Sequence, residues 1–191
     1  MKLPASAHSA YPWRIHDLAP DFRVEDVWAL PTPGGIDDFA RLVDQFAVMS
    51  FPDGAPWIVR KLWAARWRIG EWLGWDEPGK SLDARVSSLR DRLPADSQEH
   101  PKAVELPADH PFTSIYQFNH EYAAETANAT VHIVLHLAWV PEDAGGYRGQ
   151  MTSLVKPNGR FGNLYMRAIK PIRYLIVYPA LMDAFKRDWD S

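Results

Sequence analysis

The stretch TVHIVLHLAWV, residues 130–140, decides the fold of this protein because its residues divide into two alternating faces. Its β-branched residues and Trp139 favour a strand, in which side chains repeat every second residue. A polar turn, PEDAGG at 141–146, separates it from a second stretch of strand character, YRGQMTSLVKP at 147–157. This pattern predicts a β-hairpin. The face of the first arm that we expect in the core consists of Val131, Ile133, Leu135, Leu137 and Trp139.

An earlier stretch, DFRVEDVWALP at 21–31, also alternates and predicts a half-buried first strand. We expect the turn residues PTPGG at 31–35 to end it. Two helices are expected next, one from Asp37 onward and one over residues 56–75. The face of the first strand that we expect to be buried holds Phe22, Val24, Asp26, Trp28 and Leu30.

Between these helices and the hairpin, the pattern is less regular. Residues 76–110 are polar and Pro-rich, which predicts a surface loop with a short helix near residues 82–93. Residues 112–127 look extended, although HEYAAETA at 120–127 could also form a helical turn.

The C-terminal segment predicts a long amphipathic helix that starts near residue 159. Pro171 and Pro179 should each break or kink it, because proline lacks an amide hydrogen. At 100° per residue, Arg173 and Tyr174 fall on the polar face. The apolar face is expected to hold Phe161, Leu164, Tyr165, Ala168, Ile169, Ile172, Leu175 and Ile176, and to shift to Leu181, Phe185 and Trp189 after Pro179.

Grouped helices and grouped strands in this order predict an α+β fold. A curved antiparallel sheet needs a cover for its apolar face, and the last helix is the longest element available. We therefore expect one domain over residues 1–191, with the sheet wrapped around the C-terminal helix and two helices after the first strand.

Composition narrows the function classes. The chain has 191 residues, a net charge of −3 and no cysteine. It therefore has no general attraction for nucleic acid, no disulfide framework and no thiol nucleophile. It also contains no P-loop, no dinucleotide fingerprint and no G-x-S-x-G elbow, so we expect no cofactor. Without a signal-like or membrane-spanning stretch, we expect a cytoplasmic protein of bacterial type.

Several stretches together resemble the bacterial family of domain of unknown function 2867. They are PWRIHDLAPDFRVEDVWALPTPGG, RWRIGEWLGW, TVHIVLHLAWV, GGYRGQMTSLVKPNGRFGNLYM and YPALM. The resemblance implies a helix-grip fold similar to the START and Bet v 1-like (SRPBCC) superfamily. Members of that superfamily bind lipids, steroids and polyketides in an apolar cavity, and some catalyse cyclisation or hydrolysis.

His132 and His136 lie four residues apart and could suggest a metal or catalytic pair. Ile133 occupies the position where the helical zinc-protease motif needs a glutamate. On a strand the two residues would be about 13 Å apart, too far to share one metal ion without a bulge. We therefore expect no metal site here. Two interpretations stay open: the histidines form hydrogen bonds across the sheet or face partial solvent, or they line a cavity as polar anchors or a general base.

Arg66 lies in the middle of the apolar stripe of the helix expected over 56–75. A buried guanidinium needs a partner, and Asp26 is one candidate. Otherwise Arg66 could reach the surface, or it could bind an acidic group of a ligand. The expected ligand wall is apolar with a few hydroxyls, and Gly149 and Ser153 would leave room above it. The residues that we expect to bind the ligand are Arg66, Tyr116, Trp139, Tyr147, Met151, Ser153 and Tyr165.

These features favour a small-molecule-binding protein whose partner is a hydrophobic molecule of lipid, steroid or polyketide type. The alternative is a cyclase, hydrolase or isomerase that uses the same cavity, with His132 or His136 as general base. A third, less favoured reading is membrane-surface contact by residues 57–75, whose five tryptophans accompany a local charge of +3, four basic residues minus one glutamate. His120, Glu121 and Glu125 form a weak acid-base or metal candidate, and we expect them on a solvated edge.

Overall fold

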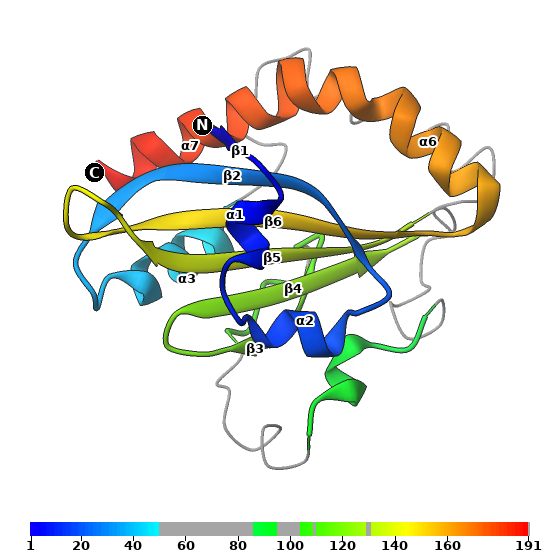
Figure 1. The fold of residues 1–191 in the computed structure, drawn as a ribbon, viewed down its shortest axis with the longest axis horizontal. Coiled ribbons are helices and arrows are strands. Elements are labelled where there is room, and N and C mark those ends of the chain that lie inside the picture. Colours follow the sequence, from blue (N-terminus) through cyan, green and yellow to red (C-terminus); the bar gives the residue numbers. More distant parts are fainter. Residues whose placement is uncertain (50–85, 95–103, 109, 129–130, 191) are drawn as a thin grey trace.

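The structure is a computed structural model, and the part that it describes comprises residues 1–49, 86–94, 104–108, 110–128 and 131–190. Its strands form one curved antiparallel sheet in the order β1-β2-β6-β5-β4-β3 (Figure 1). The strands are β1 (Lys2–Leu3), β2 (Arg23–Gly34), β3 (Thr113–Gln117), β4 (Glu121–Ala127), β5 (Val131–Pro141) and β6 (Tyr147–Pro157). The helical alternative for residues 120–127 is therefore wrong, because these residues form β4.

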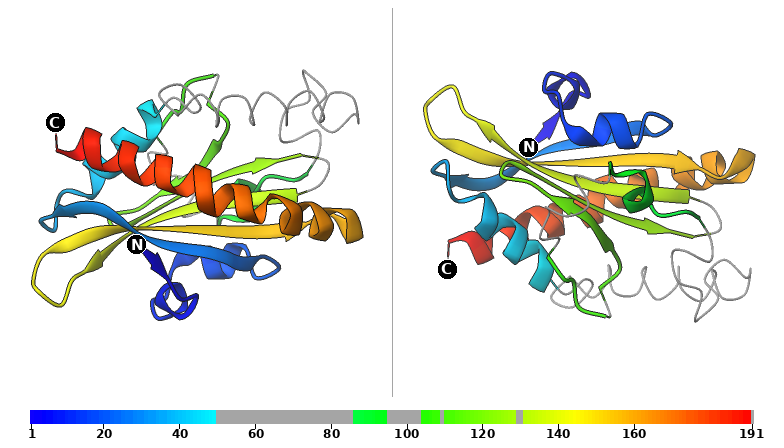
Figure 2. Two further views of the ribbon diagram at one scale, coloured as in Figure 1. Left: turned by 90° about the horizontal axis from the view of Figure 1, so that it is seen from above. Right: turned by 90° about the horizontal axis from the view of Figure 1, so that it is seen from below.

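Helices cover both faces of this sheet (Figure 2). The C-terminal helix and α3 lie on one face, and the N-terminal helices lie on the other. The helices are α1 (Ser6–Ser9), α2 (Arg14–Leu18), α3 (Phe39–Val48), η2 (Leu89–Arg92), α6 (Gly159–Ile172), η3 (Arg173–Val177) and α7 (Tyr178–Trp189). This is the α+β arrangement expected from the sequence, consistent with a helix-grip fold. The short helices α1 and α2, which precede the first long strand, were not expected.

The β5–β6 hairpin confirms the reading of residues 130–157. Gly145 and Gly146 have φ angles of 92° and 83°, a backbone conformation that other residues rarely adopt. This conformation allows the tight connection between the two strands. Leu135, Leu137 and Trp139 pack in the core cluster beneath the C-terminal helix. The face expected to be core is thus the face that meets this helix, and both histidines lie on the opposite one.

Strand β2 differs from the expected pattern in two places. Its register shifts between Val24 and Asp26, where a β-bulge adds one residue to the strand. As a result, Phe22 and Val24 lie on one face of the sheet and Trp28 lies on the other. A second shift between Ala29 and Pro33 lets the strand continue through the prolines to Gly34. The prediction that PTPGG ends the strand is therefore wrong.

The C-terminal helix is not broken at either proline. Between α6 and α7 the chain stays helical but forms a π turn, η3. A π turn contains more residues per turn than an α-helix, so it rotates the side chains that follow. Tyr174, expected on the polar face, packs against Trp28 of the sheet, whereas Leu175, expected on the apolar face, is 77% exposed. The apolar face after Pro179 is as expected, with Phe185 and Trp189 buried.

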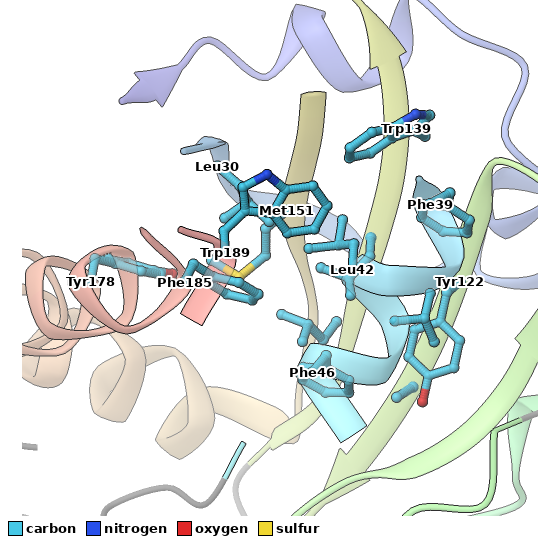
Figure 3. Packing of buried hydrophobic residues seen from close by; sticks show 14 residues of the cluster. Leu30, Phe39, Leu42, Phe46, Tyr122, Trp139, Met151, Tyr178, Phe185 and Trp189 are labelled. Atoms are coloured by element: carbon cyan, nitrogen blue, oxygen red, sulfur yellow. The ribbon is translucent and has the colours of Figure 1, made fainter. Parts of the chain in front are cut away.

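The larger core cluster joins α3 and α7 to the sheet (Figure 3). Leu42 of α3 lies directly over Gly149, where an added Cβ would be 2.8 Å from a Leu42 methyl carbon. Gly149 therefore permits close packing of α3 and does not leave the open space expected there. No helix in the described part is long and apolar enough to cross a membrane.

Candidate functional site

The residues expected to line one site lie on two faces of the sheet. Trp139, Tyr147 and Met151 pack in the cluster beneath the C-terminal helix, and Ser153 lies on the same face, opposite Asp26 of β2. Tyr116 does not join them, because it packs on the opposite face beneath the N-terminal helices. Arg66 with the rest of 57–75, and the side chain of Tyr165, lie outside the described residues.

A buried carboxylate, Asp26, is the centre of the polar groups beneath the C-terminal helix. Asp26 is only 2% exposed and is reached by two tyrosine hydroxyls from the helix. Tyr174 donates to Oδ1, and Tyr178 donates to Oδ2 at 2.8 Å. The π turn makes this possible, because it turns Tyr174 toward the sheet together with Tyr178. We call the group of Asp26, Trp28, Arg173, Tyr174 and Tyr178 the Asp26 site.

Charged groups close the outer side of the Asp26 site. Arg173 Nη2 donates to Glu25 Oε1 at 2.8 Å and lies 3.4 Å from Asp26 Oδ2. Lys2 Nζ donates to the Tyr174 hydroxyl at 2.7 Å, which ties the first strand to the π turn. The bulge in β2 brings Glu25 and Asp26 to the same guanidinium, although neighbouring strand residues normally face opposite ways.

Burial decides the protonation of the Asp26 site. It raises the pKa of Asp26 above its usual value, and the Tyr178 hydrogen bond and the Arg173 charge only partly offset it. Burial and the nearby Asp26 carboxylate also raise the pKa of Tyr178, so that this hydroxyl keeps its proton at neutral pH. The site therefore offers a protonated phenol, that of Tyr178, beside a carboxyl group that gains a proton more readily than an exposed one.

Two buried donors at the Asp26 site have no hydrogen-bond partner among the described residues. They are the indole Nε1 of Trp28 and the Nε of Arg173. The Trp28 ring lies 4.6 Å from the ring of Tyr178 and 6.1 Å from that of Tyr174. Buried donors normally have partners, so the Asp26 site combines an aromatic wall with unused hydrogen-bonding capacity.

On the opposite face, two histidine–glutamate pairs connect β5 to β4. His132 Nε2 lies 2.7 Å from Glu125 Oε2, and His136 Nε2 lies 3.0 Å from Glu121 Oε2. His132 lies opposite Ala127, which is two residues after Glu125. His136 lies opposite Ala123, which is two residues after Glu121. The two pairs are therefore equivalent diagonal contacts, which repeat after four residues on both strands. This confirms the interpretation of hydrogen bonds across the sheet.

These carboxylates also hold other segments on the sheet. Glu125 is fully buried and accepts from the Ser88 hydroxyl at 2.5 Å and the Leu89 amide at 3.1 Å. Glu121 accepts from the Arg14 amide at 3.0 Å and the Tyr116 hydroxyl at 3.0 Å. The expectation of a solvated edge for these glutamates is wrong, because η2 and α2 are anchored on them.

His136 also faces a third histidine, His8 of α1. Their ring centres are 5.1 Å apart, and His8 Nδ1 lies 3.1 Å from the Thr152 hydroxyl. Burial, with His136 and His16 nearby, lowers the pKa of His8 to about 3. Burial also lowers the pKa of His136, although Glu121 partly opposes this. Both rings are therefore neutral at pH 7.

Glu121 sets the orientation of the neutral His136 ring. Burial alone would raise the pKa of Glu121, but the hydrogen bonds from His136, the Arg14 amide and the Tyr116 hydroxyl lower it below its usual value. An ionised carboxylate only accepts hydrogen bonds, so His136 Nε2 carries the proton and Nδ1 keeps its lone pair. In the described part of the chain, His136 Nδ1 and His8 Nε2 have no hydrogen-bond partner, and no group of three or more His, Asp or Glu is placed to hold a metal ion.

Sequence reasoning missed the tyrosines and Arg173 of the Asp26 site, since a regular helical wheel places Arg173 and Tyr174 on the polar face. It also missed His8. One signal for the glutamates was present: Glu121 and Glu125 repeat after four residues, as do His132 and His136. In an antiparallel pair this matched spacing allows two equivalent contacts.

One family matches the sequence, over residues 18–180, and is described as "Protein of unknown function (DUF2867)". The chain belongs to the DUF2867 family. The match covers β2, the β5–β6 hairpin and the C-terminal helix as far as Ala180, and therefore includes the Asp26 site and both histidine–glutamate pairs. No curated protein and no solved structure matches the chain.

Proposed function

We propose that this DUF2867 protein binds a small hydrophobic molecule between the sheet and the C-terminal helix, with the polar group of the ligand at the Asp26 site. The observation that carries the proposal is the pair of buried, unpartnered donors, Trp28 Nε1 and Arg173 Nε, beside a buried carboxyl group. An apolar pocket with a few convergent polar groups is the usual form of a small-molecule site.

The face of the sheet that holds the Asp26 site supports a hydrophobic ligand. Aromatic and aliphatic side chains that are only partly buried pack against the core on this face, including Trp28, Tyr147, Tyr174, Leu181 and Met182. Lipid-, steroid- or polyketide-like molecules would fit such a surface. Members of the START and Bet v 1-like superfamily bind ligands of these kinds. The proposal includes membership of that superfamily and a bacterial cytoplasmic setting.

A ligand screen tests the proposal. We expect thermal stabilisation, and a one-to-one complex in native mass spectrometry, with at least one compound among fatty acids, steroids and aromatic polyketides. Y178F and Y174F should weaken binding of that compound. Y11F is the matched control, because Tyr11 packs at the N-terminal helices on the opposite face. If no class stabilises the protein, or if Y11F weakens binding as much as Y178F does, the proposal fails.

A second candidate is an enzyme that uses His136 as general base, and the Glu121–His136 pair favours it. Glu121 fixes the ring and leaves the Nδ1 lone pair unpartnered among the described residues, as a general base requires. His136 is fully buried beneath the N-terminal helices, so a substrate could reach it only if they move. Turnover of p-nitrophenyl esters that is lost in H136Q but kept in H120Q, where the histidine is exposed, would support this candidate. Equal rates in both variants would exclude it.

A further inference from the structure

Resting on the proposed function, we infer that the polar end of the ligand is a neutral carbonyl oxygen, as in a ketone, aldehyde or ester. The inference follows from which hydrogen-bonding groups of the Asp26 site are already used and which are not.

Both tyrosine protons of the Asp26 site are occupied. Tyr174 and Tyr178 each donate to a different oxygen of Asp26. The unpartnered groups, Trp28 Nε1–H and Arg173 Nε–H, are donors with no ability to accept. A guest that uses these two groups therefore has to accept hydrogen bonds. A carbonyl oxygen has two lone pairs and no hydrogen of its own to donate, so it matches these donors.

The charges around Arg173 favour a neutral acceptor over a carboxylate. Arg173 already contacts two carboxylates, Glu25 at 2.8 Å and Asp26 at 3.4 Å. The half-exposed Arg23 reaches Glu25 from outside, with its Nε 3.4 Å from Oε2. An anionic guest would place a third carboxylate beside one guanidinium in a buried place, where uncompensated charge is costly. A ketone oxygen accepts the same hydrogen bonds without that cost.

The test compares probes that share one apolar chain. These are methyl undecyl ketone, the corresponding secondary alcohol, the corresponding alkane, and lauric acid, each measured by calorimetry or native mass spectrometry. We expect the ketone to bind about tenfold more tightly than the alkane, since one good hydrogen bond has about this effect. The alcohol should bind less tightly than the ketone, because its hydroxyl hydrogen would enter a buried place whose unpartnered groups are donors. Stronger binding of lauric acid than of the ketone would overturn the carbonyl assignment.

Two variants locate the contact. W28F keeps an aromatic ring but removes the indole N–H, and it should remove about tenfold of the preference for the ketone. W189F is the matched control, because the Trp189 indole donates to the Pro33 carbonyl, away from the Asp26 site. It should leave the preference unchanged. An unchanged preference in W28F, or an equal loss in W189F, would overturn the inference.

Spectroscopy on the wild-type protein keeps the test independent of how the variants fold. A ketone labelled with carbon-13 at its carbonyl should show a lowered C=O stretching frequency when bound, and the Trp28 indole proton should shift downfield. If all four probes bind equally and neither signal moves, the carbonyl inference fails but the proposed function stands. If neither these probes nor any class in the ligand screen binds, the proposed function fails.

Discussion

The two faces of the sheet both bury carboxylates, but they partner them differently. Beneath the N-terminal helices, Glu121 and Glu125 pair with histidines and also accept hydrogen bonds from backbone amides. Beneath the C-terminal helix, Asp26 accepts tyrosine hydroxyls, and two donors beside it have no described partner. The carboxylates of the first face hold segments of the chain on the sheet, whereas Asp26 binds the C-terminal helix beside two unused donors. Among the described residues, unpartnered atoms occur on the first face as well, at His8 Nε2, Trp13 Nε1 and His136 Nδ1. The following predictions test this difference, from the largest expected effect to the smallest.

Glu125→Ala should produce the largest loss of stability. It leaves His132, Ser88 and the Leu89 amide without their buried acceptor, and removal of one partner from a buried pair costs about 3–5 kcal/mol. Urea unfolding measures this change in the free energy of unfolding. Glu105→Ala, at an exposed position, should change stability by less than about 0.5 kcal/mol. A loss below about 1 kcal/mol for Glu125→Ala would contradict the structural role given to this face.

Acid should destabilise the protein through the histidine face. His8 has its pKa lowered from 6.5 to about 3 in the folded protein, so below pH 6.5 the unfolded chain binds a proton that the folded chain does not. The free energy of unfolding should therefore decrease as the pH is lowered from 6.5 to about 3, by about 1.4 kcal/mol per pH unit for such a histidine. Because the pKa of His136 is also lowered, it should contribute with the same sign.

Urea unfolding at a series of pH values measures this slope. His8→Gln should make the slope shallower over this interval, whereas His120→Gln, at an exposed position, should not. A stability that is independent of pH between 6.5 and 4 would contradict buried neutral histidines.

Asp26→Asn should be tolerated far better than the change at Glu125. Burial already raises the pKa of Asp26, which means that the folded protein disfavours its charge. An amide can still accept from one tyrosine, so we expect a change in stability within about 1.5 kcal/mol. The loss of stability should shrink further at low pH, where the wild-type Asp26 is itself protonated. A loss as large as that of Glu125→Ala would show that Asp26 is an anchor of the fold.

Leu175→Gln should have the smallest effect, within about 0.5 kcal/mol, because the π turn leaves this side chain 77% exposed. On a regular helical wheel, Leu175 would belong to the buried face and its loss would cost several times more. Phe185→Ala is the buried comparison on the same helix and should cost about 3–5 kcal/mol. Thermal or urea unfolding of both variants decides between the two helix geometries.

Much of the fold could be predicted because its signals are local. Alternation in residues 131–140 and the glycines at 145 and 146 specify the hairpin and its core face. Which face meets the C-terminal helix is decided only by the tertiary structure. The β2 bulge and the π turn could not be predicted in this way, since each inserts one residue into an otherwise regular pattern. Each insertion changes which side chains face inward, and for that reason a regular pattern does not place Arg173 and Tyr174 beside Asp26.

The sequence by itself determined an α+β chain with a strand hairpin, a long C-terminal helix and a histidine face separate from the core face. Alternation and helical periodicity are properties of neighbouring residues, so they can be read before folding. Only the tertiary structure decided the partners of the polar groups. Glu125 meets His132, and Asp26 meets Tyr178, 152 residues away, because strand register and a π turn bring them together. Such pairings change when the register shifts by one residue. The burial of whole faces decides that register, and the local sequence does not.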